Sequence, residues 1–275
     1  MITDRETNHV YLSGVLRRAK YSAFRKRFEQ KLKEHRIRYD FLRLTNDIWC
    51  RDYMPVQVLQ NKFVQFEYDP VYLPWTDATK VCKDIDIEPK ITDIKLDGGN
   101  VVKSRTKVIV TERMVRTNKR LYERKELIRQ FKRLLAVKDV ILIPECPTDP
   151  FGHADGMVRF CDGVKDERHV FVNDYGAEEA KLKKDLYAVL KGHGLIPIPM
   201  PYNPPENDGL SARGIYINYL QIGKTVFYPT YRLSSDKKAK KFFFEYFGSN
   251  AVSVRADEIA NEGGILNCIG WNVRI

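Results

Sequence analysis

Residues 215–254, IYINYLQIGKTVFYPTYRLSSDKKAKKFFFEYFGSNAVSV, hold the pattern that decides the fold. The apolar runs at 215–220, 225–228 and 252–254 predict three strands. Between the second and third, residues 236–247 have helical periodicity, with two serines and Asp236 at the start and Gly248 at the end. This stretch therefore predicts a structural unit of one helix and about three strands.

The same unit recurs along the chain. Further helical patterns cover residues 19–35, 76–82, 119–135 and 177–192, so a helix begins about every 55 residues. Strand-like runs lie at 9–12, 39–44, 56–59, 63–66, 108–111, 140–143, 170–172 and 195–199, and the pair 56–59 and 63–66 forms a hairpin. Strands that alternate with helices indicate an α/β protein, here with five modules. We expect one domain over residues 1–275, with the proline-dense segment 197–205 as a surface lid.

The positive charge lies mainly on the helices. The chain has a formal net charge of +11. The net charge of its four longer predicted helices slightly exceeds this value, so the rest of the chain has a net charge close to zero. Such charges usually form the solvated outer face of amphipathic helices, so we favour this reading over a nucleic-acid surface.

Other compositional features exclude several classes of protein. No apolar stretch reaches the 18 to 20 residues or so that a membrane span needs, and no signal peptide opens the chain, so we expect a soluble, cytoplasmic protein. The five cysteines form no C-x-x-C pair, so we expect neither a disulfide framework nor a cysteine-rich zinc site.

Four short polar segments could carry chemistry: Trp49–Pro55 (WCRDYMP), Asp97–Asn100 (DGGN), Gly152–Gly156 (GHADG) and Glu262–Cys268 (EGGILNC). Taken singly, each has an ordinary structural explanation. The Gly-Gly pairs read as turns, the His-x-Asp as a surface loop, Trp49 as a core aromatic and Cys268 as a small buried side chain.

Taken together and in this order, the four segments resemble the guanidine-modifying (pentein) enzyme superfamily, within it the agmatine deiminase and bacterial-type peptidylarginine deiminase family. The matching elements are Trp49-x-Arg51-Asp52, Asp97-Gly98-Gly99, Gly152-His153-x-Asp155 and Gly263-Gly264 ahead of Cys268. The resemblance implies a five-bladed α/β propeller of repeated ββαβ modules, with the long helices outside and the active site at the axis.

The resemblance also implies roles for individual residues. Asp52 and Asp155 would clamp the guanidinium through charge-assisted hydrogen bonds. Cys268 would attack the guanidine carbon, activated by protonated His153 or by the cationic substrate itself, because an ordinary thiol is mostly protonated at neutral pH. His153 would then protonate the leaving ammonia and activate the hydrolytic water.

Other residues would support this chemistry. Trp49 and Asn218 would border the substrate, and Asp97 would either contact the substrate or orient Arg51. The implied reaction converts a guanidino group to a ureido group plus ammonia through a covalent thiouronium intermediate, without a metal or an organic cofactor. The partner would be a small-molecule or peptide guanidine, neither a membrane nor nucleic acid is expected, and a homo-oligomer is compatible with the sequence.

Departures from the family pattern leave the substrate open. Agmatine deiminases usually carry Thr-Gly where this chain has Tyr53-Met54, and Gly-Gly-Gly-Asn-Ile-His-Cys where it has EGGILNC at 262–268. The candidates are agmatine, which would indicate polyamine (putrescine) biosynthesis, peptidyl arginine, free arginine and another alkylguanidine. An arginine carboxylate would need a cation, for which the candidates are Arg105, Arg113 and Arg213. The alternative functions are an amidinotransferase and a catalytically idle basic protein that binds nucleic acid or protein.

Overall fold

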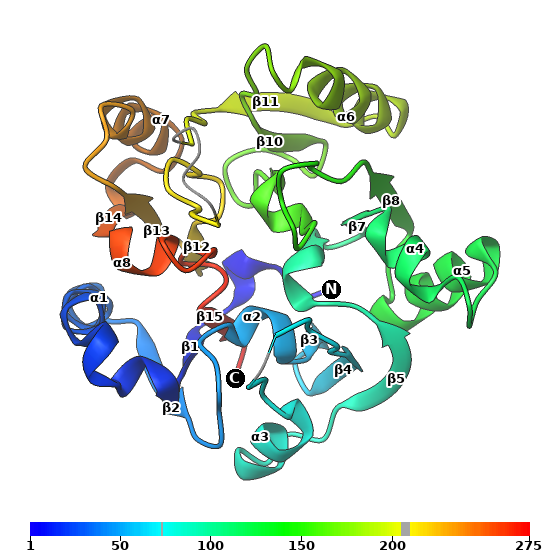
Figure 1. Ribbon diagram of the computed structural model, residues 1–275, viewed down its shortest axis with the longest axis horizontal. Helices are drawn as coiled ribbons and strands as arrows, with labels where there is room; N and C mark the ends of the chain where they lie inside the picture. The colour runs from blue at the N-terminus through cyan, green and yellow to red at the C-terminus, as the bar shows by residue number, and fades with distance from the viewer. Residues whose placement is uncertain (73, 205–209) are drawn as a thin grey trace.

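Five three-stranded sheets surround a common centre in the computed structural model, which describes residues 1–72, 74–204 and 210–275 (Figure 1). The sheets are β15 (Gly270–Val273), β1 (His9–Ser13) and β2 (Arg38–Leu42); β3 (Val56–Leu59), β4 (Lys62–Glu67) and β5 (Lys90–Lys95); β6 (Val102–Lys103), β7 (Lys107–Thr111) and β8 (Asp139–Ile143); β9 (Val158–Phe160), β10 (His169–Asn173) and β11 (Ile196–Met200); β12 (Leu220–Ile222), β13 (Thr225–Thr230) and β14 (Ala251–Arg255). In every sheet the middle strand pairs antiparallel with the inner strand and parallel with the outer one. This repetition confirms the five modules predicted from helix spacing.

Helices join the middle strand of each sheet to its outer strand, as a parallel pair requires. They are α1 (Ser22–Glu34), α3 (Ala78–Asp84), α4 (Arg113–Asn118) with α5 (Arg124–Leu135), α6 (Ala180–Gly192) and α7 (Asp236–Phe247). These helices lie at the periphery of the molecule in Figure 1. Shorter helical turns are α2 (Cys50–Tyr53), α8 (Asp257–Ala260), η1 (Asp4–Glu6), η2 (Gly14–Arg17), η3 (Ala19–Tyr21), η4 (Gly98–Asn100), η5 (Ala154–Gly156) and η6 (Gly248–Asn250).

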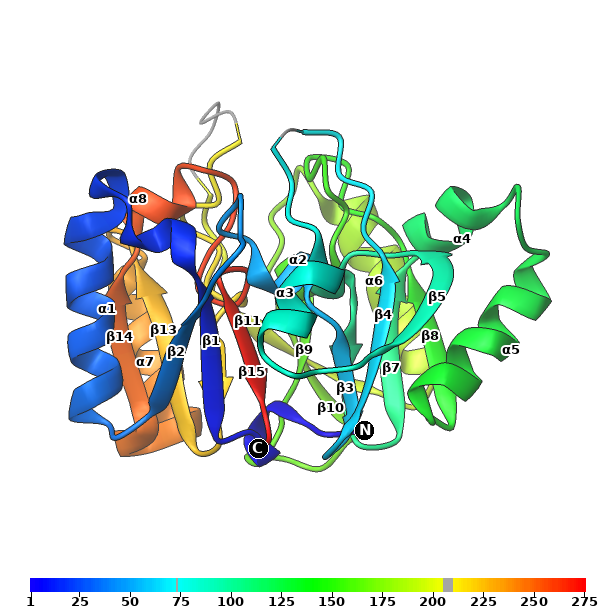
Figure 2. The same cartoon turned by 90° about the horizontal axis from the view of Figure 1, so that it is seen from below.

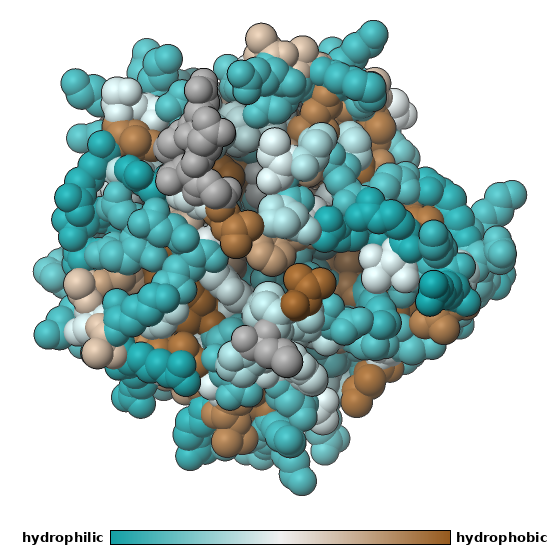
Figure 3. All heavy atoms as spheres, in the orientation of Figure 1, coloured by the Kyte–Doolittle hydropathy of each residue, from teal (hydrophilic) through white to brown (hydrophobic). Residues whose placement is uncertain are grey.

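Apolar stripes on the long helices pack against the sheets. Phe24, Phe28 and Leu32 of α1 are buried, as are three residues at the same spacing on α6, Leu182, Leu186 and Leu190. Most lysines and arginines of these helices are exposed, and hydrophilic side chains cover much of the rim in Figure 3. The basic excess therefore lies on outward helix faces, as the amphipathic pattern predicts. In the described part of the chain, no helix combines the length and apolarity needed to cross a membrane.

Three details differ from the sequence predictions. The helix expected over 119–135 begins later, as α5 at Arg124. A separate short helix, α4, precedes it and ends at Asn118, whose side chain bonds to the backbone of Lys95 and Met114. The strand expected at 215–220 is mostly irregular and joins a strand only at Leu220. Its apolar side chains except Ile215 are buried, because the segment runs through the core. A short run of buried apolar residues does not by itself distinguish a strand from an irregular buried segment.

The expected lid over 197–205 is the third difference. Residues 197–200 belong to β11, an outer strand that pairs parallel with β10. Pro197 and Pro199 are tolerated there because an edge strand leaves one side of its backbone unpaired. Pro205, the last residue of that predicted lid, lies outside the described residues.

Candidate active site

The polar segments singled out in the sequence each precede the inner strand of a sheet. Trp49 and Asp52 lie just before β3, Asp97 before β6, His153 and Asp155 before β9, Asn218 before β12, and Asn267 and Cys268 before β15. Because the inner strands are equivalent in the five modules, these segments meet at the same end of the molecule. In Figure 2, α2 and α8 lie toward that end and both chain termini toward the other.

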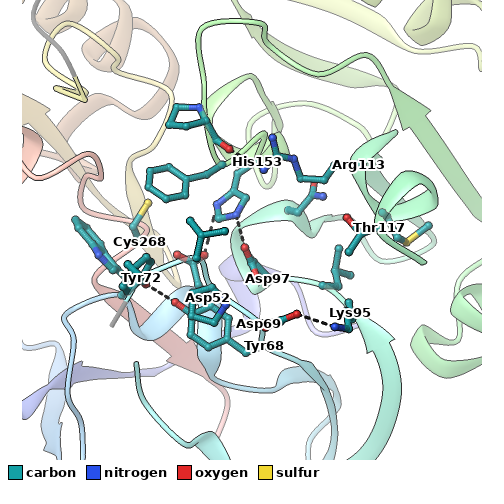
Figure 4. Close-up of a pocket in the computed structure, with 18 of the residues that line it drawn as sticks. Asp52, Tyr68, Asp69, Tyr72, Lys95, Asp97, Arg113, Thr117, His153 and Cys268 are labelled. Atoms are coloured by element: carbon teal, nitrogen blue, oxygen red, sulfur yellow. Dashed lines mark hydrogen bonds and ion pairs between the residues drawn. The ribbon is translucent and has the colours of Figure 1, made fainter. Parts of the chain in front are cut away.

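A cavity of about 250 Å³ opens among these segments. Its walls include Trp49, Asp52, Asp97, His153 and Cys268, which Figure 4 shows together with the residues of the outer part of the cavity. Asp155 and Asn218 are buried but are not among the lining residues. The structure thus brings the predicted residues into one cluster, with two of them behind the cavity wall.

His153 is held between two carboxylates. Its Nε2 lies 2.9 Å from Oδ2 of Asp97 and its Nδ1 lies 3.6 Å from Oδ1 of Asp52. Burial by itself lowers the pKa of His153, but Asp52 and Asp97 outweigh it and raise that pKa well above the usual range. The side chain is therefore an imidazolium at neutral pH.

Asp52 is tied to the glycine segment that follows Asp97. The Gly99 N–H donates to Oδ1 of Asp52 over 3.0 Å. A Cβ on Gly99 would lie 2.5 Å from that oxygen and 2.7 Å from Nδ1 of His153, so glycine is needed for the close approach. Burial, together with Asp97 and Asp155, raises the pKa of Asp52, while His153 opposes the rise.

Cys268 lies beside an amide oxygen and near the carboxylates. Its Sγ is 3.3 Å from Oδ1 of Asn218, to which the thiol donates. Burial raises the pKa of the Cys268 thiol well above its ordinary value, and Asp155 and Asp52 raise it further. In the free protein the sulfur is therefore a thiol, and an additional positive charge is needed to ionise it.

Asn267 positions the groups behind the cavity wall. Its Nδ2 donates to Oδ2 of Asp155 over 2.7 Å, and its backbone N–H donates to Oδ1 of Asn218 over 3.2 Å. Burial raises the pKa of Asp155, while His153 and this hydrogen bond oppose the rise. Asn267 was not among the predicted site residues, although its place directly before Cys268 was a usable signal.

Asp97 differs from one of its expected roles. Its carboxylate contacts His153, whereas the Arg51 side chain donates to the carbonyl of Asn267 and to Oδ1 of Asn272. The prediction that Asp97 orients Arg51 is therefore wrong. The two segments are adjacent in space, since a Cβ on Gly98 would lie 2.0 Å from the carbonyl oxygen of Arg51, but the Asp97 carboxylate bonds to the imidazole of His153.

The three arginines considered for a substrate carboxylate lie in different places. Arg113 lines the cavity, where it donates to Glu145 and to the carbonyl of Pro150. Arg105 pairs with Glu6, and Arg213 donates to the carbonyl of Tyr231; neither is among the lining residues.

Aromatic side chains in the cavity wall were also missed, namely Tyr68, Tyr72 and Phe151. Phe151 directly precedes the Gly152-His153 segment, which was a usable signal. Tyr68 and Tyr72 share a hydrogen bond between their hydroxyl groups and follow β4, where no pattern in the sequence indicated a site. Within residues 1–72, 74–204 and 210–275, no group of three or more His, Cys, Asp and Glu side chains is arranged to hold a metal ion.

Comparison with known proteins points to one family. Residues 4–273 match the family described as Porphyromonas-type peptidyl-arginine deiminase. A Streptococcus mutans serotype c protein provisionally named agmatine deiminase is 27% identical over 286 residues, which cover 87% of this chain and 77% of that protein.

Two solved structures illustrate the shared fold. The C. jejuni agmatine deiminase with substrate bound has a TM-score of 0.76 at 17% identity, over 100% of this chain and 96% of that chain. DDAH from Pseudomonas aeruginosa has a TM-score of 0.59 at 10% identity, over 97% and 99% of the two chains.

Proposed function

Because the chain belongs to the Porphyromonas-type peptidyl-arginine deiminase family, we propose that it is a cysteine-dependent deiminase. It would convert a guanidino group to a ureido group plus ammonia through a thiouronium adduct on Cys268. The observation that carries the proposal is a single cavity lined by a thiol, an imidazolium and two carboxylates, Cys268, His153, Asp52 and Asp97. We also infer that the five modules, as one domain, close into the five-bladed propeller of the pentein fold, since β6 contacts β9 and β12 contacts β15 across sheet boundaries.

Substrate binding would begin at the carboxylates. A guanidinium presents a planar fork of N–H donors, which Asp52 would accept at the cavity wall. Asp155, held by Asn267, would contribute its negative charge from behind the wall, and Trp49 would pack against the alkyl chain. The arriving cation also favours ionisation of Cys268, since the nearby carboxylates that raise the thiol pKa would be neutralised.

The reaction would then proceed in two stages. The Cys268 thiolate forms a bond to the guanidine carbon, and the C–N bond breaks as His153 gives a proton to the departing ammonia. Neutral His153 next takes a proton from water, and the resulting hydroxide adds to the same carbon. The C–S bond then breaks to restore the thiolate, and the added hydroxyl gives its proton to solvent, which leaves the ureido carbonyl. Asp52 and Asp97 would keep His153 in place through both transfers.

The outer part of the cavity favours a substrate without a free carboxylate. Acidic lining residues outnumber basic ones, and the lining cations are already paired: Lys95 with Asp69, Arg113 with Glu145, and His153 with Asp52 and Asp97. Agmatine, which has a second cation, and peptidyl arginine, whose backbone is uncharged, would therefore be accepted more readily than free arginine.

The direct test is a substrate screen scored by ureido formation and ammonia release. We expect activity with agmatine or an arginine peptide, a lower rate with free arginine, and none in Cys268→Ala. Undiminished turnover in Cys268→Ala would refute the assignment of the nucleophile. If an added amine accepts the amidino group faster than water does, the protein is instead an amidinotransferase.

A further inference from the structure

The segment that leads to His153 has no regular secondary structure. Residues 144–153, which we call the His153 segment, connect β8 to the turn η5 and contain neither a helix nor a strand. Its backbone is therefore held by individual contacts rather than by a ladder of hydrogen bonds. The imidazole at its end lies between Asp52 and Asp97, which come from other loops. The contacts that hold this segment consequently also set the place of His153.

Two side chains hold the last turn of this segment. Oδ1 of Asp149 accepts from the N–H of Phe151 over 2.8 Å, and its Oδ2 accepts from the N–H of His153 over 3.1 Å. The buried hydroxyl of Thr111, at the end of β7, donates to the carbonyl of Gly152 over 2.8 Å. The turn from Asp149 to His153 is therefore tied together from within and attached to the core on one side.

Arg113, the first residue of α4, holds the same segment from outside. Its Nη1 donates to the carbonyl of Pro150 over 2.7 Å, and its Nε donates to Oε2 of Glu145 over 3.0 Å. Arg116 donates to both oxygens of Glu145, over 2.6 and 2.8 Å, so this acceptor is itself fixed. A single guanidinium thus connects the beginning of the His153 segment with the turn near its end, and attaches both to α4.

The Arg113 guanidinium also packs directly against the residue before His153. Gly152 has a φ of +62°, and a Cβ there would lie 2.6 Å from Nε of Arg113 and 3.0 Å from Oε2 of Glu145. Glycine is therefore required both by the backbone conformation and by the closeness of the ion pair. Figure 4 shows Arg113 beside His153 at the cavity. A shift of the Arg113 side chain would free the backbone next to the imidazole.

We propose that Arg113 is a positioning residue, which holds the His153 segment so that the imidazole stays between Asp52 and Asp97. Although Arg113 lines the cavity, its guanidinium would then serve the protein and would not receive a carboxylate of the substrate. This inference deepens the proposed function and rests on it for the role of His153 as acid and base. The contacts of Arg113 with the segment do not depend on that function.

Loss of Arg113 has two effects of opposite sign on the pKa of His153. Removal of a nearby positive charge would by itself raise that pKa, since a neighbouring cation disfavours the imidazolium. A displaced imidazole would instead move away from Asp52 and Asp97, which now raise the pKa, so the pKa would fall. The other carboxylate that raises it is Asp155, which follows His153 closely in the chain. The sign of the change therefore distinguishes a lost charge from a lost contact.

The test is an NMR titration of the histidine side chains in the full-length protein, with His153→Gln to assign one signal among the five histidines. We expect the midpoint of His153 to be about one pH unit lower in Arg113→Gln than in the unaltered protein. Arg113→Lys keeps the charge but can reach only one of the two acceptors, so it should give a smaller shift in the same direction. Arg129→Gln is the matched control, because it removes an exposed cation that pairs with Glu126 on α5, and it should leave the midpoint unchanged.

An unchanged or raised midpoint in the folded Arg113 variants would overturn the proposal, and Arg113→Lys decides the matter if Arg113→Gln does not fold.

The ureido assay gives a second readout. In Arg113→Gln we expect kcat/KM to fall by about 10-fold to 100-fold, mainly through kcat, and equally for agmatine and free arginine, because a misplaced acid and base slows every substrate. A receptor for a substrate carboxylate would behave differently: its loss would slow free arginine and spare agmatine, and that result would also overturn the proposal. If the unaltered protein turns over no guanidine, the proposed function fails, whereas the titration still tests how Arg113 holds His153.

Discussion

His153 and Cys268 line the same cavity but have opposite electrostatic environments. The imidazolium is stabilised by direct contact with Asp52 and Asp97, whereas the thiolate is destabilised by burial and by Asp155 and Asp52. Asp52 acts on both groups, so in the proposed reaction it helps to keep the acid charged and the nucleophile neutral until a cation arrives. Under the proposed function, a site of this kind would react with cationic substrates and be protected from unspecific thiol chemistry.

This arrangement predicts an alkaline profile for thiol alkylation. The rate of Cys268 modification by iodoacetamide should rise with pH through an inflection above about 8.5, the value of an ordinary cysteine, because burial and the carboxylates raise the thiol pKa. Asp155→Asn should move the inflection to lower pH, since it removes one of the charges that raise it. Cys268→Ser measures the background from the other four cysteines, all of them buried. An inflection at or below 8.5 in the unaltered protein would contradict this account.

At the scale of elements, the Gly-Gly segments let backbone pass close to the site residues. A Cβ on Gly98 would overlap the carbonyl of Arg51, and one on Gly264 would overlap the Trp49 ring. The loops before β3, β6 and β15 can therefore meet only if these positions lack a side chain. This explains why the glycine pairs lie beside the cavity, although each pair taken alone is typical of a simple turn.

Gly264→Ala should consequently lose both activity and stability. We expect the free energy of unfolding to fall by about 1–3 kcal/mol, as overpacking of a filled site usually costs, and turnover to fall because Trp49 must shift. Urea unfolding and the ureido assay measure the two effects. Gly192→Ala is the matched control: it lies in α6 with no atom within 4 Å of the added Cβ, so stability should stay the same or increase slightly. Equal behaviour of the two variants would mean that the contact with Trp49 is unimportant.

At the scale of the whole molecule, the N-terminal segment connects modules that are distant in sequence. Asp4 joins Arg159 of β9 to Asn272 of β15, and Lys103 of β6 lies nearby. The terminal segment thus contributes to the centre of the molecule rather than to its surface.

Asp4→Asn should therefore destabilise the protein in a pH-dependent manner. The pKa of Asp4 is about 2 in the folded protein, below its value in the unfolded chain. Its contribution to the free energy of unfolding is therefore fully present above the unfolded pKa and is lost as the pH falls through about 2. We expect a loss of about 2 kcal/mol at pH 7. Denaturant unfolding of both proteins from pH 7 to pH 3 should show the difference narrowing toward the acid end. Asp185→Asn, at an exposed pair with Lys181, should have little effect at any pH. No difference between Asp4→Asn and the unaltered protein at pH 7 would contradict the role of Asp4.

The elements that could be predicted are those whose pattern is local. Phe24, Phe28 and Leu32 specify one face of a helix because an apolar residue recurs at about every helical turn. The inner strands β6, β9 and β15 could not be predicted, since each is short and carries a polar residue where an apolar one is expected. Lys103, Arg159 and Asn272 are buried there only because other modules surround them.

The sequence by itself determined the five-module order, the outward helix charge and the set of segments in which Asp52, His153, Asp155 and Cys268 occur. These features depend on neighbours within a few residues or on the order of motifs along the chain. The tertiary structure alone decided that Asp97 contacts His153, that Asn267 holds Asp155, and that Arg159 and Lys103 lie around Asp4. Such pairings join side chains 56 to 155 positions apart, and only the packing of the modules brings them within hydrogen-bonding distance.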